Sequence, residues 1–289
     1  MLALPLLIAL SLLAPVASQA QELPRLHWVI TDAPPSVITD GPLQGEGYVQ
    51  KLLSELLVPG LPDWRHEVQV GSGLRILRDL ASRPNACTPY MTRTPARAAQ
   101  FHLSRPWIRY LPVGVVMRRD APGRPSAGTP LSLADYLAST ARPRVAVVAG
   151  RSYTPALDAV LARTPAQVHG LPLTRATRSV LAMIVSRRDV DATLVGDLEL
   201  SYFERLHPEW RNQLVWLPLK EQPSEPLMGA VGCARTAEGR RIIRAVNKLL
   251  EQPRVLADAQ RYYEHWLPPA SLERLRRERM EAPAPTSPH

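Results

Sequence analysis

The chain has 289 residues, of which 45% are hydrophobic and 21% are charged, and this composition excludes a disordered chain as the default description. Its formal net charge is +9, carried almost wholly by arginine. A nucleic-acid-binding surface needs a basic stripe with stacking aromatic residues, whereas these arginines are scattered and aromatic residues make up only 6% of the chain. We therefore expect a folded protein with a basic surface and no nucleic-acid partner.

The first 20 residues, MLALPLLIALSLLAPVASQA, form an apolar run closed by small residues. Ser18 and Ala20 occupy the positions that a signal peptidase reads, so we predict a cleaved secretory signal at 1–20 and a periplasmic mature protein. A membrane anchor needs about 20 uninterrupted apolar residues, and Pro5 and Pro15 interrupt this run. Because the segment contains no Lys or Arg, an anchored N-terminus stays open as the alternative.

The next part of the chain alternates between strand and helix patterns. Strands are predicted at RLHWVI, HEVQV and NACTPYM, and helices at 45–57 and 73–82. The first helix has apolar residues at 48, 49, 52, 53, 56 and 57, which lie on one helical face. This alternation is typical of a mostly parallel sheet covered by helices on both faces.

A second α/β unit follows, between about 118 and 213. Helices are predicted at 132–139, capped by Ser132, and at Pro155–Arg163, where a proline at the first position follows Thr154 as the cap. Further helices are predicted at 174–186 and 197–206, with strands at 144–150, 167–173 and 191–196.

Two extended, proline-bearing segments, 110–117 and 214–223, bracket this second unit. They predict a hinge that the chain crosses twice, after which one strand and two helices return to complete the first unit. We therefore expect lobe I at 21–112 and 219–268, lobe II at 113–218, and a charged, disordered tail at 269–289.

The chain has two cysteines, Cys87 and Cys233. An even pair in an exported protein predicts a disulfide, and both residues fall in lobe I. Two buried free thiols are the alternative. Neither cysteine lies in a CxxC motif or near histidines at metal-ligand spacing, so we expect no metal site and no cofactor.

The layout and its loop residues resemble the bacterial family 3 extracellular solute-binding proteins, over about residues 25–266. Five segments carry the resemblance: WVITDAPPS (28–36), GEGYVQKLL (45–53), TPARAAQFHLSRPW (94–107), VAGRSY (148–153) and DVDATLVGD (189–197). Within the family, the chain looks closest to a poorly characterised branch with a cysteine just before the TPxR step. The resemblance implies two α/β lobes of the type II arrangement, joined by a two-strand hinge and closing on a small solute.

In the amino-acid binders of this family, the arginine of the TxxR step holds the α-carboxylate of the ligand, and Arg97 has that position here. A guanidinium matches a carboxylate with two parallel hydrogen bonds and stays charged at any relevant pH. The alternative is an arginine that binds neighbouring carbonyl groups or an acid. Ser104 begins the segment that runs towards the hinge, and Trp107 is expected to pack in the core.

The resemblance also suggests other ligand-binding residues. Asp32, in the loop after the first strand, would form a wall of the cleft; a plain proline turn is equally compatible. Tyr48 begins the first helix after Gly47 and fits a core position as well. In lobe II, Arg151, Ser152 and Tyr153 follow a strand end, where open α/β sheets bind ligands, and capping is the alternative role for Ser152.

One departure from the family concerns the acid that holds the ammonium group of an amino acid. Counting from Asp191, the expected position is Gly196, and Asp197 follows one place later. Asp197 is therefore a candidate ligand residue, but an α-amino group on the ligand is no longer implied.

We predict a monomeric binding protein for a small carboxylate-bearing solute, such as an amino acid, with an ABC permease or a membrane sensor as partner. The alternatives are a dehydratase-like enzyme on the same fold and a ligand sensor without a transporter. No GxSxG, HExxH, P-loop or complete GxGxxG motif is present, and Glu46 is the one acid that we place near the lobe I mouth for an enzyme. We therefore predict no catalytic residue.

Overall fold

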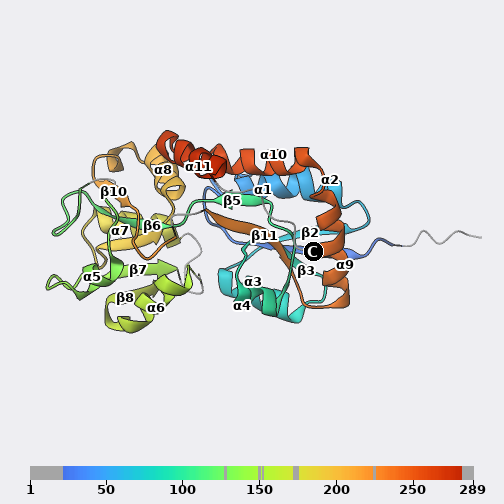
Figure 1. The fold of residues 1–289 in the computed structure, drawn as a ribbon, viewed down its shortest axis with the longest axis horizontal. Coiled ribbons are helices and arrows are strands. Elements are labelled where there is room, and N and C mark those ends of the chain that lie inside the picture. The colour runs from blue at the N-terminus through green and yellow to red at the C-terminus, as the bar shows by residue number, and fades with distance from the viewer. Residues whose placement is uncertain are drawn as a thin grey trace, which may run out of the picture.

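Two α/β lobes lie side by side in the computed structural model (Figure 1). The structure describes residues 22–126, 129–148, 151, 153–171, 176–223 and 226–281. The predicted signal segment, Ser152 and the last eight residues of the tail lie outside these described residues.

Lobe I contains a six-stranded sheet in the order β2-β1-β3-β11-β4, with β5 also paired to β11. Strand β1 is parallel to β2 and β3, whereas β11 runs antiparallel to β3, β4 and β5. The strands are β1 (Arg25–Ile30), β2 (Arg65–Val70), β3 (Ala86–Thr92), β4 (His102–Leu103), β5 (Ile108–Tyr110) and β11 (Leu227–Cys233). In Figure 1, α1 and α10 lie above this sheet and α3 and α4 lie below it.

Helix α3 begins where the sequence predicts, whereas the first helix begins at Tyr48 instead of residue 45, and α4 forms where only a turn was expected. The first helical segment runs through α1 (Tyr48–Lys51), a π-helical stretch (Leu52–Leu57) and α2 (Val58–Gly60), and it buries the periodic apolar face. The others are α3 (Gly73–Ser82), α4 (Pro95–Gln100), α9 (Ala237–Leu249) and α10 (Pro253–Glu264).

Lobe II contains a five-stranded sheet in the order β10-β6-β9-β7-β8. Its strands are β6 (Gly114–Arg118), β7 (Val145–Val148), β8 (Val168–Leu171), β9 (Ala192–Val195) and β10 (Leu214–Leu217), and its helices are α5 (Leu133–Ala138), α6 (Pro155–Arg163), α7 (Ala176–Val185) and α8 (Asp197–Leu206). The Ser132 and Thr154 hydroxyl oxygens accept hydrogen bonds from the backbone N–H groups of Asp135 and Leu157, which confirms both predicted helix caps.

The chain changes sheets twice. It leaves the lobe I sheet after Tyr110 and enters the lobe II sheet at Gly114, then leaves lobe II after Leu217 and re-enters lobe I at Leu227. The fold class is therefore the expected α/β two-lobe arrangement. The sheets are mixed instead of mostly parallel, because β11 in lobe I and β6 in lobe II run antiparallel to their neighbours.

The C-terminal tail corrects a prediction. Instead of being disordered from residue 269, the chain forms α11 (Pro269–Glu281), which follows α10 and lies next to α8 of the other lobe (Figure 1). Leu275 is only 1% exposed, and ion pairs with a four-residue spacing, such as Arg274 with Glu278, stabilise the helix. Leu275 and the partly buried Leu272 pack against the core, and Ser271 binds Asp197, so this mostly charged helix is held against the rest of the protein.

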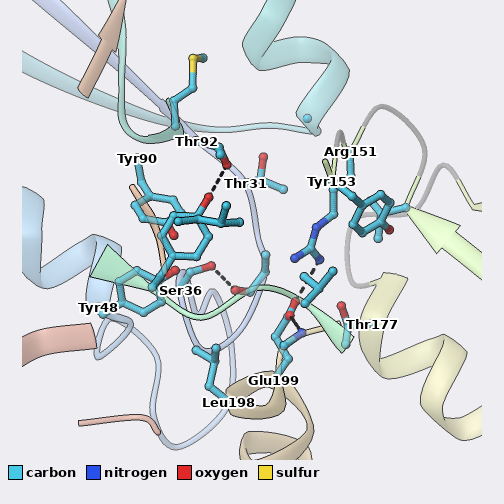
Figure 2. A pocket seen from close by; sticks show the side chains of 18 of the residues that line it. Thr31, Ser36, Tyr48, Tyr90, Thr92, Arg151, Tyr153, Thr177, Leu198 and Glu199 are labelled. Atoms are coloured by element: carbon cyan, nitrogen blue, oxygen red, sulfur yellow. Dashed lines mark hydrogen bonds and ion pairs between the residues drawn. The ribbon is translucent and has the colours of Figure 1, made fainter. Parts of the chain in front are cut away.

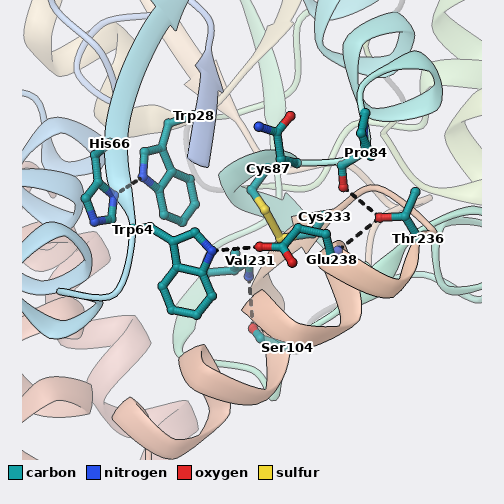
Figure 3. The surroundings of a disulfide bond; sticks show 12 residues. Trp28, Trp64, His66, Pro84, Cys87, Ser104, Val231, Cys233, Thr236 and Glu238 are labelled. Carbon is teal, nitrogen blue, oxygen red and sulfur yellow. Dashed lines mark hydrogen bonds between the residues drawn. A yellow bond between two sulfur atoms is a disulfide. The ribbon is translucent and has the colours of Figure 1, made fainter. Parts of the chain in front are cut away.

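A disulfide joins Cys87 of β3 to Cys233 of β11, two residues that are directly paired in the sheet. The pair is fully buried, and Figure 3 shows it close to the side chains of Trp64 and Glu238, which share a hydrogen bond of 2.8 Å. The predicted pairing is confirmed, and the link ties the returning C-terminal strand to the N-terminal part of lobe I.

Candidate functional site

A cavity of about 310 Å³ lies between the two lobes, and both contribute to its wall. Lobe I supplies Asp32 from the loop after β1, Tyr48 at the start of α1, and Arg97. Lobe II supplies residues that follow β7 and β9. The carboxyl ends of strands from both sheets therefore meet at one cavity, which is where open α/β sheets bind ligands.

Arg97 is positioned by the short helix α4. The Thr94 hydroxyl caps this helix by accepting a hydrogen bond from the Arg97 backbone N–H at 3.2 Å. The Arg97 guanidinium donates from Nη1 to the Thr92 carbonyl oxygen at 3.1 Å, so the alternative of a neighbouring carbonyl partner is met for one donor. A guanidinium has five N–H groups, and four of them have no hydrogen-bond partner within the described residues.

The Arg97 side chain is half-buried, and loss of water around it is the main cause that lowers its pKa, with partial compensation from Tyr110 and Asp158. Arginine nevertheless stays protonated in proteins. The cavity thus presents a desolvated positive charge with free donors, which favours a carboxylate because charge-assisted hydrogen bonds strengthen when water is excluded.

On the lobe II side, Arg151 lies between Glu199 and Tyr153 (Figure 2). Arg151 Nη1 donates to Glu199 Oε1 at 3.2 Å, and the guanidinium carbon lies 5.3 Å from the centre of the Tyr153 ring. Burial acts to lower the pKa of Arg151, but the charge of Glu199 and its hydrogen bond to Arg151 oppose this effect and the net shift is upward. Arg151 is therefore a fixed cation with an anionic partner.

Glu199 was not predicted from the sequence. It is the third residue of α8, and its Oε2 accepts a hydrogen bond from the Gly196 backbone N–H at 2.5 Å. A glutamate three residues after a helix-capping position is the sequence signal that could have identified it.

Asp197 corrects a site prediction, because it does not line the cavity. Its Oδ1 accepts from the Leu198 backbone N–H at 2.7 Å, and its Oδ2 accepts from the Ser271 hydroxyl of α11. Asp197 is the first residue of α8, and its carboxylate points towards the C-terminal helix α11. Glu199 lines the cavity wall, where we expected Asp197. Burial is the main cause that raises the pKa of Asp197.

Four tyrosines form the aromatic part of the lobe I wall. Tyr48 contacts Tyr90 and Tyr263 edge to face, with ring centres 5.7 and 5.5 Å apart, and Tyr110 lies 5.3 Å from Tyr90. Burial raises the pKa of all four hydroxyl groups, so they stay neutral. Tyr48 is 5% exposed and belongs both to the core and to the cavity wall.

The other candidates fall in different places. Asp32 and Tyr153 line the cavity, whereas Glu46 lies outside it and forms an ion pair with Lys51 at 3.1 Å. Ser104 is fully buried, with its Oγ accepting from the Val231 backbone N–H at 3.0 Å. Trp107 is 3% exposed, as expected for a core residue.

The described residues hold no group of three or more acidic, histidine or cysteine side chains arranged for a metal ion. None of the helices within the described ranges is long and apolar enough to cross a membrane.

Similarity to known proteins is found at the level of structure. No protein-family model and no curated protein matches the sequence. A histidine kinase sensor domain with similarity to periplasmic binding proteins superimposes with a TM-score of 0.64 at 15% identity, covering 85% of this chain and 96% of that one.

Two further solved structures give the same result. The substrate-binding protein of an amino acid ABC transporter has a TM-score of 0.62 at 17% identity, over 84% of this chain and 98% of that one. The ancestral amino acid-binding protein AncCDT-1, a precursor of cyclohexadienyl dehydratase, has a TM-score of 0.62 at 18% identity, over 84% and 96%. These likenesses span nearly the whole of each compared structure, and the chain has the two-lobe fold of periplasmic binding proteins.

Proposed function

We propose that the protein is a periplasmic solute-binding protein that holds a small carboxylate-bearing solute between its lobes. The observation that carries the proposal is Arg97, a half-buried cation in the wall of the interlobe cavity with one side-chain hydrogen bond in the described structure. A carboxylate would satisfy two of its free N–H donors at once. Contacts from both lobes to one solute would stabilise a closed arrangement.

The binding event would serve either transport or sensing. The structurally similar proteins include a binding protein of an amino acid ABC transporter and a histidine kinase sensor domain, so both output types occur on this fold. We favour delivery to an ABC permease, and the predicted signal segment at 1–20 supports export to the periplasm.

An enzyme on the same fold is the second candidate, since the ancestral protein AncCDT-1 is described as a precursor of a dehydratase. Dehydration needs a proton donor that faces the ligand. Glu46, the acid suggested for this role, binds Lys51 outside the cavity. Saturable binding without chemical change of the ligand would favour the binding protein, and turnover of a bound acid would favour the enzyme.

The test combines ligand identification with a charge-removing variant. Small molecules released from the purified protein are identified by mass spectrometry, and a panel of carboxylic acids is screened by thermal shift against wild type and Arg97→Ala. Removing a charge-assisted hydrogen-bond partner costs about 1.5–3 kcal/mol, which corresponds to roughly a 10- to 150-fold weaker affinity. The stabilising acids should therefore raise the melting temperature of wild type much more than that of Arg97→Ala.

Arg78→Ala is the matched control, because Arg78 is an exposed arginine on α3 of the same lobe and does not line the cavity. It should respond to each acid as wild type does. Equal stabilisation of wild type and Arg97→Ala by the same acid would contradict the carboxylate role of Arg97.

A further inference from the structure

Resting on the proposed function, we infer that the Arg151–Glu199 ion pair sets the specificity of the cavity, so that the ligand is a carboxylic acid bearing an uncharged polar group in place of an α-ammonium group. A 2-hydroxy or 2-oxo acid is the class that fits. The ligand group in question is the one that would lie near Arg151 and Glu199 of lobe II.

The Glu199 carboxylate is already bound by other groups of the chain. Its Oε1 accepts from Arg151 at 3.2 Å and its Oε2 accepts from the Gly196 backbone N–H at 2.5 Å, so both oxygens already have a donor. Its side chain is only 11% exposed. A ligand ammonium could reach this carboxylate only by sharing it with the Arg151 guanidinium or by displacing it.

Displacing the Arg151 guanidinium from Glu199 would cost free energy. Arg151 is held on its other side by the face of the Tyr153 ring, and cation–π contacts favour that position. An ammonium placed beside Glu199 would therefore lie close to a fixed positive charge, and like charges at short range in a partly buried site repel strongly. A hydroxyl or carbonyl group carries no net charge and avoids this repulsion.

The cavity wall also contains buried polar atoms that could bind a polar group of the ligand. Among the described residues, the hydroxyls of Thr31 and Tyr153 and the side-chain oxygen of Gln222 line the cavity, are buried, and have no hydrogen-bond partner. Buried polar atoms normally have partners. A ligand hydroxyl can donate and accept hydrogen bonds, so it can satisfy groups of this kind without adding charge.

Asp32 is the other carboxylate in the cavity wall. It is 7% exposed and takes part in interactions of its own, and it lies on the lobe I side, in the loop after β1. It is the residue through which an ammonium-bearing ligand could still be held, and the experiment must separate this outcome.

The experiment uses matched pairs of acids that differ only in the group on the α-carbon. L-phenylalanine and L-phenyllactate, L-leucine and L-2-hydroxy-4-methylpentanoate, and L-aspartate and L-malate are titrated calorimetrically into the mature protein at neutral pH. We expect the hydroxy acid of the best-bound pair to bind at least tenfold more tightly than the amino acid in wild type.

Variants of the pair assign the cause. Arg151→Gln removes the fixed cation and leaves Glu199 to accept an ammonium, so the preference for the hydroxy acid should fall at least tenfold or reverse. Arg151→Lys keeps the charge and should keep the preference. Glu199→Gln leaves Arg151 without its anion and should strengthen the preference, which provides an independent readout if Arg151→Gln does not fold.

Each outcome decides between the two levels of the account. An amino acid that binds wild type as tightly as its hydroxy partner, with both weakened by Arg97→Ala, overturns the specificity inference and leaves the proposed function standing; loss of that binding in Asp32→Asn would assign the ammonium site to Asp32. Binding that Arg97→Ala does not change overturns the proposed function. Absence of binding by every pair overturns the ligand class stated here.

Discussion

Single residues control the chemistry of the cavity because local backbone structure fixes where each charge lies. Arg97 is placed by a helix of only six residues, started by the Thr94 cap and by Pro95. Arg151 and Tyr153 follow the end of β7, and Glu199 is held by its own bond to the start of α8. Arg97 and Glu199 therefore each bind a backbone group within a few residues, and Arg151 is bound by Glu199, which limits the freedom of these side chains before a ligand arrives.

At this scale, the sequence identifies residues next to recognisable turns and strand ends. Arg97, Asp32 and Tyr153 line the cavity as expected from their segments, and their ligand-binding roles stay predictions. Asp197 and Glu199 are two positions apart on one helix, and the helix-capping spacing that singles out Glu199 does not show that Asp197 turns away from the cavity. The difference depends on Ser271, which comes from a distant helix and binds Asp197.

Asp120 gives a prediction on pH. Its carboxylate accepts from Arg118 at 2.8 Å and from Arg187 at 2.5 Å, and these partners lower its pKa to about 2, from an ordinary value of 3.8. A lowered pKa in the folded state means that the charged form stabilises the fold, fully above about pH 4, and that this contribution is lost as the pH falls towards about 2.

The measurement compares melting temperatures of wild type and Asp120→Asn between pH 6 and pH 2. Wild type should melt higher at pH 6, by a small amount because the pair is exposed, and the difference should vanish near pH 2. Asp63→Asn is the control, since Asp63 is exposed and forms no ion pair within the described chain. A difference that grows as the pH falls would show that the sign is wrong.

The disulfide is a covalent link between two strands of the lobe I sheet. It joins β3 to β11 across 146 residues of chain. Removal of a native disulfide typically costs 2–5 kcal/mol, so Cys87→Ala combined with Cys233→Ala should lower the urea midpoint clearly. The same midpoint in the variant and in the oxidised wild type would contradict a structural role for this bond.

Helix α11 gives a second prediction at the scale of elements. Leu275 is 1% exposed within it, and truncation of a buried leucine costs about 2–5 kcal/mol. Leu275→Ala should therefore lower the free energy of unfolding by about this amount in urea denaturation. Leu23→Ala removes a leucine that is 50% exposed and should stay within about 0.5 kcal/mol of wild type.

Most strands and helices are predictable from the sequence because their apolar residues repeat with the period of one structure. The helical segment that begins at Tyr48 is an example of this periodicity. The caps Ser132 and Thr154 are a second kind of local signal, because their hydroxyl groups mark where helices begin. Helix α11 lacks this apolar repeat, because most of its residues are polar or charged. Leu275 is buried only through its contacts with the rest of the protein. Pairing of β11 with β3 likewise joins two strands that are far apart in the sequence, and the two cysteines are the one sequence signal that indicates it.

At the scale of the whole molecule, the C-terminal segment of lobe I contacts lobe II outside the cavity. Trp266, which follows α10, lies 5.7 Å from the ring of Tyr202 on α8, and Arg205 lies 6.0 Å above the same indole. Together with the bond between Ser271 and Asp197, these contacts support one side of the interlobe boundary. The cavity lies between the same two lobes, so a ligand that touches both walls would add to these contacts.

We propose that one carboxylate-bearing solute binds between the lobes and contacts residues of both cavity walls. The most direct measurement is the calorimetric affinity of the best-bound acid for wild type, for Arg97→Ala in lobe I and for Tyr153→Phe in lobe II, which removes a single cavity-lining hydroxyl. We expect both variants to bind the acid more weakly, by at least tenfold for Arg97→Ala and by several fold for Tyr153→Phe. Wild-type affinity in the Arg97→Ala variant, or a loss confined to one lobe, would rule out binding through both walls.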